Sequence, residues 1–135
     1  MAGYSGTALS KKLGIKTGFR VKTRDAPSDY KALLSPIPDA AVVSSRLRPP
    51  VDIFHLFIKS RSQLAVALKR GLREIHQDGA IWVSWPKKVS GVSTDVTEDV
   101  VRELALPLSL VDVKVCAVDD IWSALKLVIR KGQRK

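Results

Sequence analysis

The segment VDIFHLFIK, Val51 to Lys59, is apolar at nearly every position. Such a run predicts a strand that is covered on both faces, as in a parallel sheet flanked by helices. Pro49 and Pro50 directly precede it, where their missing N–H groups do least harm. His55 lies inside this run, and its apolar neighbours favour a hydrogen-bonded core or subunit-contact histidine over a ligand or a catalytic base.

Further elements follow from periodicity and turn residues. Alternation of apolar and basic residues predicts a strand at Phe19–Thr23. A helix begins after Ser60 or Ser62, because either serine can cap it and apolar residues recur behind it at helical spacing. The other expected elements are helices at Leu9–Leu13 and Asp29–Leu34, strands at Ala41–Ser45 and Ala80–Trp85, a turn at Asp78-Gly79, and a last helix capped by Asp95 with Glu98.

The C-terminal third changes character. Leu110–Val118 alternates strictly, Asp119-Asp120 makes a turn, and Ile121–Ile129 runs back. So short a connection joins antiparallel strands. The predicted fold is therefore a Rossmann-like α/β three-layer sandwich, whose mostly parallel sheet ends in a C-terminal antiparallel β-hairpin. We expect one domain over residues 1–130 and a disordered basic tail over residues 131–135.

Composition limits the classes of protein to which this chain can belong. The 135 residues are 45% hydrophobic and 27% charged, as in a globular protein. No apolar stretch is long enough for a membrane span, and no secretory signal is recognisable. The single cysteine, Cys116, excludes an internal disulfide and favours the reducing cytoplasm. Two distant histidines and one cysteine do not predict a metal site.

The net charge of +10 is unevenly spread. The segments Lys11–Arg24 and Lys126–Lys135 contain basic residues but no acidic ones, whereas acidic residues outnumber basic ones in Asp95–Asp120. This asymmetry is compatible with a polyanion-binding surface. Solvated faces and a basic tail are the favoured interpretation, because no aromatic stacking platform or RNA-binding motif accompanies the charge.

Several stretches carry a resemblance to known proteins. LGIKTGFRV, HQDGAIWVSWPK and LSLVDVKVCAV resemble parts of the class I, Rossmann-like methyltransferase fold, which also ends in an antiparallel hairpin. The whole chain more closely resembles a family of small bacterial proteins of unknown function. LSKKLGIK, WVSWPKK, TDVTEDVVRE and LVDVKVCAVDDIWSALKLV carry that second likeness, which implies no established activity.

The chain departs from methyltransferases where they bind their cofactor. Their loop after the first strand is glycine-rich, because backbone must approach the ligand closely. Here the loop reads TRDAPSDY, Thr23 to Tyr30, without glycine, and Pro27 withdraws one N–H. VVSSRLRPP offers no acid after the second strand, and the chain lacks room for one βα unit of the full fold. We therefore expect no adenosylmethionine binding and assign no cofactor.

Loops at the carboxyl ends of the strands form the candidate ligand site. AIWVSWPKKVSG supplies the most distinctive of them, in which Trp82 and Trp85 serve strand packing while the lysines are free to bind. The mixture suits a small anion near helix N-termini, and nothing in it resembles a catalytic set. The predicted rim consists of Asp25, Arg61, Lys87, Lys88, Ser90 and Thr94.

Three functions remain open. The favoured one is a non-catalytic binding or interaction domain whose partner is a small anion, another protein or a second copy of the chain. The second is a small transferase-like enzyme using the Trp85–Ser93 loop. The third is a nucleic-acid-associated protein using the basic N-terminal segment and tail.

Overall fold

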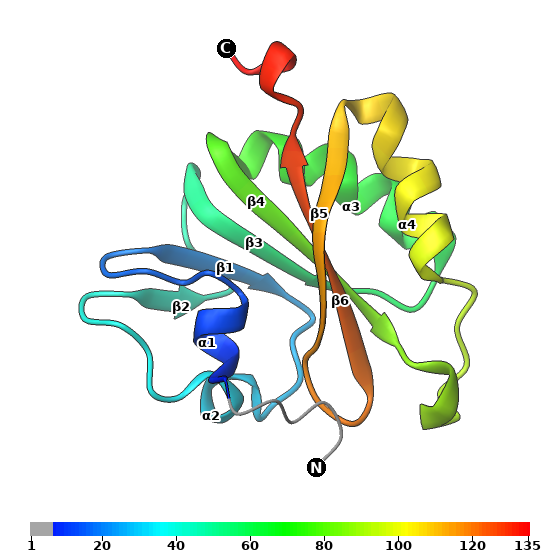
Figure 1. Cartoon of the computed structure of the whole chain (residues 1–135), viewed down its shortest axis with the longest axis horizontal. Coiled ribbons are helices and arrows are strands. Elements are labelled where there is room, and N and C mark those ends of the chain that lie inside the picture. The colour runs from blue at the N-terminus through cyan, green and yellow to red at the C-terminus, as the bar shows by residue number, and fades with distance from the viewer. Residues whose placement is uncertain (1–6) are drawn as a thin grey trace.

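One six-stranded sheet organises the chain in the computed structural model, which describes residues 7–135 (Figure 1). The strands are β1 (Arg20–Arg24), β2 (Val42–Ser44), β3 (Val51–Phe57), β4 (Ile75–Pro86), β5 (Leu110–Ala117) and β6 (Trp122–Ile129). The helices are α1 (Leu9–Lys12), α2 (Tyr30–Leu34), α3 (Arg61–Glu74) and α4 (Glu98–Ala105), with 3-10 turns η1 (Lys88–Ser90), η2 (Leu106–Leu108) and η3 (Lys131–Gln133).

The strand order is β2-β1-β3-β4-β6-β5. The first four strands run parallel, and β6 inserts antiparallel between β4 and β5. Helices α3 and α4 cover one face, and α1 and α2 cover the other (Figure 1). The predicted three-layer α/β sandwich with its C-terminal hairpin is confirmed.

Strand β3 separates two apolar cores. Phe54 and Leu56 face the core under α3 and α4, while Ile53 and Phe57 face the core under α1 and α2. Six of the seven β3 residues are buried, which confirms the cover on both faces that the apolar run predicts.

The transition from α3 to β4 differs from the prediction. No connection separates the two, because the strand begins at Ile75, directly after the helix. The predicted turn at Asp78-Gly79 lies inside β4, where Val51 pairs with Ile75 and Ile53 already pairs with Ala80. This bulge accommodates the extra residues, and it presses the backbone of Gly79 against the Asp52 carbonyl.

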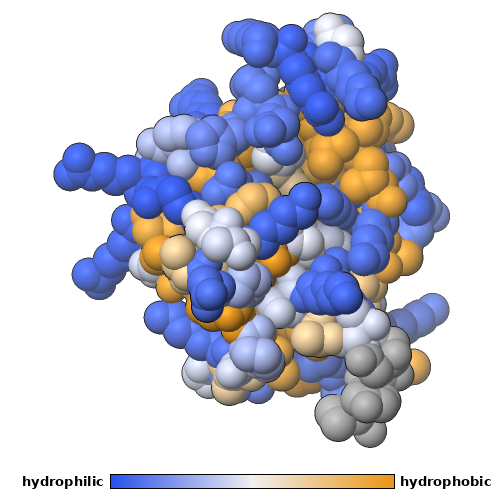
Figure 2. Space-filling model, turned by 60° about the vertical axis from the view of Figure 1, so that its left-hand side comes forward, coloured by the Kyte–Doolittle hydropathy of each residue, from blue (hydrophilic) through white to orange (hydrophobic). Residues whose placement is uncertain are grey.

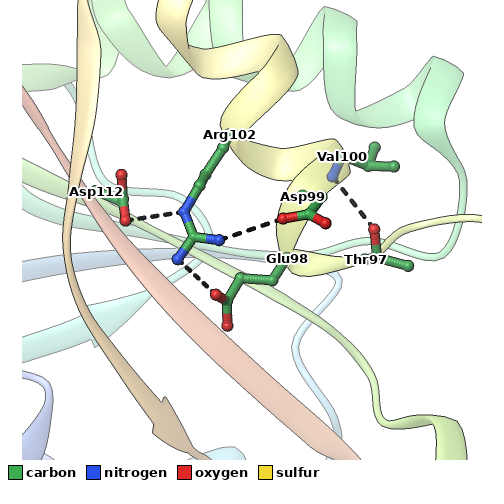
Figure 3. Close-up of polar contacts among 6 residues, drawn as sticks. All are labelled: Thr97, Glu98, Asp99, Val100, Arg102 and Asp112. Carbon is green, nitrogen blue, oxygen red and sulfur yellow. Dashed lines mark hydrogen bonds and ion pairs between the residues drawn. The ribbon is translucent and has the colours of Figure 1, made fainter.

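The start of α4 is a second correction. Thr97 is the N-cap, and its hydroxyl accepts a hydrogen bond from the Val100 amide at 3.2 Å (Figure 3). Asp95 instead accepts a hydrogen bond from the Arg61 amide at the start of α3. Glu98 does not complete a capping box, since it forms an ion pair with Arg102.

Arg102 fastens α4 to the edge of the sheet. Its guanidinium also contacts Asp99 within the helix and donates from Nε to Asp112 of β5 at 3.0 Å (Figure 3). These acids hold the pKa of Arg102 above its ordinary value, mainly through the hydrogen bonds to Asp112 and Glu98. Part of the acidic stretch in the sequence is therefore neutralised locally.

The C-terminal residues lie beyond the end of β6 (Figure 1). Arg134 donates from Nε to the Ile129 carbonyl, and the Lys135 amide donates to the Gln77 side chain. The disorder of this tail in solution stays a prediction. No helix within residues 7–135 is long and apolar enough to cross a membrane.

The Gly79 contact provides a test of the bulge. A Cβ at this position would lie 2.9 Å from the Asp52 carbonyl oxygen and 3.0 Å from that of His76. We expect Gly79→Ala to lower the free energy of unfolding by about 1–3 kcal/mol, because backbone must shift. Gly132→Ala is the control, since no atom lies within 4 Å of its added Cβ. Equal urea midpoints for the two variants would contradict the bulge.

Candidate functional site

The carboxyl ends of the parallel strands meet at one edge of the sheet. β1 ends at Arg24, β3 at Phe57 and β4 at Pro86. In open α/β sheets, ligands bind beyond this edge. The structure therefore allows each predicted rim residue to be placed relative to the others.

A cavity of about 270 Å³ opens where β1 and β2 end. Its volume is below the roughly 300–1,000 Å³ of typical ligand pockets. It is lined by the loop after β1, the start of α2 and the end of β2, with the residues Thr23, Ala26, Pro27, Ser28, Tyr30, Lys31, Val43, Ser44 and Ser45.

The loop after β1 folds back on itself. The Tyr30 amide donates to the Pro27 carbonyl at 3.0 Å, and the Leu33 amide donates to the Asp29 carbonyl. Ala26 packs against the core under α1 and α2. Asp25, at φ 58°, holds a left-handed backbone that favours glycine, and its carboxylate lies 3.9 Å from Arg24 Nε.

These residues do not fit adenosylmethionine, the cofactor of methyltransferases with this fold. The loop lining the cavity has no glycine that would let a ligand approach its backbone closely, and Pro27 offers no N–H. The end of β2 places Ser44 and Ser45 at the cavity, with no acid for a ribose hydroxyl.

A second part of the rim joins the starts of α3 and α4. Thr94 donates from its hydroxyl to the Lys59 carbonyl at 2.6 Å, next to the contact between Asp95 and the Arg61 amide. The Arg61 guanidinium lies 2.9 Å from Glu103 of α4. This pair raises the pKa of Arg61 and lowers that of Glu103, chiefly through their hydrogen bond. The Arg61 charge is thus already compensated.

The third part of the rim joins the end of β4 to the hairpin turn. Lys87 donates from Nζ to the Asp119 carbonyl at 2.7 Å, and its amide donates to the Ile121 carbonyl. Ser90 donates from its hydroxyl to the Lys87 carbonyl at 2.6 Å. Lys88 is exposed.

The rim residues make contacts in separate groups, and no hydrogen bond or ion pair within residues 7–135 joins one group to another. Arg61 and Thr94 are neighbours, because the Arg61 amide donates to Asp95 and the Thr94 hydroxyl donates to the Lys59 carbonyl. Lys87 and Ser90 are neighbours through the loop after β4. Asp25 lies at the end of β1 beside Arg24. The role of the rim as an anion site stays a prediction.

A buried polar chain lies beneath the rim. The Tyr30 hydroxyl is 2.7 Å from His55 Nδ1, and the Ser84 hydroxyl is 2.7 Å from His55 Nε2. The imidazole also stacks on Phe57, with 4.3 Å between ring centroids. Both ring nitrogens are thus satisfied, and His55 is confirmed as a hydrogen-bonded core histidine.

Burial shifts both titratable groups of this chain toward their neutral forms. It lowers the pKa of His55 to about 3 and raises that of Tyr30 above its ordinary value, with Cys116 adding to the second shift. Sequence reasoning did not pair His55 with either hydroxyl. The available signal was Ser84, a polar residue inside an otherwise apolar strand.

The two tryptophans of β4 serve packing, as predicted. Trp82 is fully buried and donates from Nε1 to the Leu13 carbonyl at 3.0 Å. Trp85 belongs to the core under α3 and α4.

Viewed with the β2 edge forward, the molecule shows hydrophilic side chains with smaller hydrophobic patches between them (Figure 2). Within residues 7–135, no group of three or more His, Cys, Asp or Glu is arranged to hold a metal ion.

Comparison with known proteins identifies the fold. No family model matches the chain, and no curated protein matches it. The fibrillarin pre-rRNA processing protein of Methanococcus jannaschii is similar in structure, with a TM-score of 0.62 at 11% identity over 87% of this chain and 69% of its own. A SAM-dependent methyltransferase of Aquifex aeolicus also gives 0.62 at 11%, over 88% of this chain and 86% of its own.

TrmN of Thermus thermophilus gives a TM-score of 0.59 at 12% identity, over 91% of this chain but only 47% of its own. These similarities show a Rossmann-like, methyltransferase-type fold. At such identities they establish the architecture alone.

The Lys87 contact predicts unequal roles for the two loop lysines. We expect Lys87→Ala to lower the free energy of unfolding by about 0.5–1.5 kcal/mol, because it loses a partly buried hydrogen bond to the hairpin turn. Lys88→Ala, the matched control, is expected to change it by less than about 0.5 kcal/mol. Thermal unfolding that leaves both variants at the wild-type midpoint would show that Lys87 does not tether the turn.

His55 predicts a pH dependence of stability. Its folded-state pKa of about 3 lies below the ordinary value of 6.5, so between these values the unfolded chain binds a proton that the folded chain does not. The free energy of unfolding therefore falls as the pH drops from 6.5 toward 3, by up to about 1.4 kcal/mol per pH unit.

Urea unfolding at a series of pH values checks this expectation. His55→Gln lowers stability at every pH, but its slope below pH 6.5 is flatter than that of the wild type. His76→Gln, the control at the other, partly exposed histidine, keeps the wild-type slope. Identical slopes for the wild type and His55→Gln would contradict a neutral, buried His55.

Proposed function

We propose that this protein is a non-catalytic Rossmann-like domain that acts by binding, with a small anion or another protein as its partner. One observation carries the proposal. The loop after β1, which follows the strand where methyltransferases hold their cofactor, has no glycine, packs on the core through Ala26 and contains Pro27, which has no N–H.

The surrounding chemistry supports binding over catalysis. His55 uses both ring nitrogens inside the core, so it is not available as a general base. In the Trp85–Ser93 loop, Lys87 and Ser90 hold the loop and the hairpin turn together. A small transferase using this loop would have to break these contacts to engage a substrate.

A second copy of the chain is the protein partner that we favour. The outer edge of β5 is unpaired in the described sheet, and Val113 and Val115 on this strand are each 53% exposed. Unpaired strand edges tend to be covered by another chain. We place this interaction in the cytoplasm, because Cys116 is a free thiol and a reducing compartment keeps it so.

Nucleic-acid association is the second candidate function. Lys69, Arg70 and Arg73 lie along the outside of α3 and make no ion pair within residues 7–135. A groove of about 480 Å³ runs between these side chains and Val66. Unpaired cations on one face are the feature that phosphate backbones recognise.

Adenosylmethionine titration tests the proposal. A cofactor with a dissociation constant of about 10 µM would stabilise the fold by about 2.7 kcal/mol at about 1 mM. We expect no shift of the thermal midpoint, whereas a functional methyltransferase of the same fold, run in parallel, is stabilised. Saturable stabilisation of this protein would show that the loop opens for the cofactor and would refute the proposal.

A further inference from the structure

Lysines from three parts of the chain lie close together, near the end of α1 and on β5 and β6. Lys114 of β5 and Lys126 of β6 are direct cross-strand partners. Lys126 Nζ lies 3.7 Å from where a side chain on Gly14, just after α1, would begin. We call this group the lysine cluster, consisting of Lys12, Lys16, Lys114 and Lys126.

The lysine cluster is electrostatically unfavourable in the free protein. Like charges directly opposite each other on antiparallel strands destabilise a sheet. Burial lowers the pKa of Lys126, and the nearby charges of Lys114 and Lys16 lower it further. The fold therefore holds an ammonium group where its charged form is disfavoured.

Backbone carbonyls accept hydrogen bonds from only two of the four ammonium groups in the lysine cluster. Lys114 donates from Nζ to the Lys12 carbonyl at the end of α1, and Lys12 donates from Nζ to the Ala117 carbonyl. Lys16, Lys114 and Lys126 form no ion pair within residues 7–135, and Lys126 Nζ also makes no hydrogen bond there. Within residues 7–135, the ammonium groups of Lys16 and Lys126 thus have no hydrogen-bond or ion-pair partner, and Lys126 is the more buried of the two.

The backbone next to Lys126 carries no side chain at Gly14. Gly14 has φ +77°, a left-handed backbone that ends α1 without a side chain. A Cβ at this position would be in van der Waals contact with Lys126 Nζ, and the glycine spares the ammonium group that apolar contact. Lysine ammonium groups act on phosphate as point charges and do not require the planar geometry of arginine.

From this arrangement we infer that the lysine cluster is a binding site for a compact, multivalent phosphate-type anion. Such an anion neutralises the Lys114–Lys126 repulsion and supplies the acceptor that Lys126 lacks. The inference rests on the proposed binding function, but it concerns a different surface from the rim and from the outer face of α3.

Tripolyphosphate is the probe, tested by thermal unfolding of the full chain at constant ionic strength. The wild-type midpoint is expected to rise by about 5 °C at about ten times the dissociation constant. Lys126→Met keeps an apolar stem of similar length and removes the charge. We expect its midpoint without the anion to lie about 1–3 °C above that of the wild type, and most of the anion response to be lost.

Lys88→Met is the matched control, because it removes one exposed lysine outside the cluster. It is expected to respond to tripolyphosphate as the wild type does. An equal response of Lys126→Met, no response of the wild type, or a lower midpoint of Lys126→Met without the anion would each overturn the inference. Stronger stabilisation by a short DNA duplex than by tripolyphosphate would also overturn it in favour of a nucleic-acid surface.

The two ligand titrations test two proposals that can be refuted independently of each other. Adenosylmethionine reports on the loop after β1, and tripolyphosphate reports on the lysine cluster. If neither ligand stabilises the wild type, the non-catalytic proposal stands and the proposed anion site is refuted. If adenosylmethionine stabilises the wild type, the non-catalytic proposal is refuted, whether or not tripolyphosphate also stabilises it.

Discussion

The burial of β3 on both faces is the constraint on which the structure depends. Its side chains enter two separate cores, so helices have to cover the sheet on both sides. One buried polar residue, His55, lies in this strand, and it is tolerated because Tyr30 and Ser84 satisfy both ring nitrogens. The same contacts tie α2 to the two central strands beneath the candidate rim.

This architecture brings together the strand ends where related folds bind a cofactor, but the loop after β1 has no glycine and folds back on itself. Ala26 packs inward, Pro27 removes a donor, and the remaining cavity is small. A methyltransferase-type fold and the absence of a methyltransferase loop are therefore compatible. The fold fixes where a ligand can sit, whereas the loop residues decide which ligand is accepted.

The sequence predicts the architecture better than the site. The apolar run of β3 and the alternating hairpin strands carry their signals locally, so their places in the sheet were foreseeable. Thr97 and Asp95 both stand where a helix cap is expected, and only the distant start of α3 shows that Asp95 is used there. The hydrogen bond from Lys87 to the Asp119 carbonyl spans 32 positions, beyond the reach of local patterns.

The lysine cluster was hidden for a related reason. Lys114 faces Lys126 because the register of β5 shifts between Asp112 and Lys114, and strict alternation does not predict such a shift. Likewise, the bulge at the start of β4 depends on the match with Val51 across the sheet. Pairing between strands decides these positions, so one sequence read along its length does not show them.

We propose that the loop after β1 is closed to adenosylmethionine. Amide NMR during titration with this compound observes the loop directly, residue by residue. The account predicts that the amide signals of Arg24 to Tyr30, apart from the proline, keep their positions at every concentration. Saturable shifts confined to this loop would contradict it.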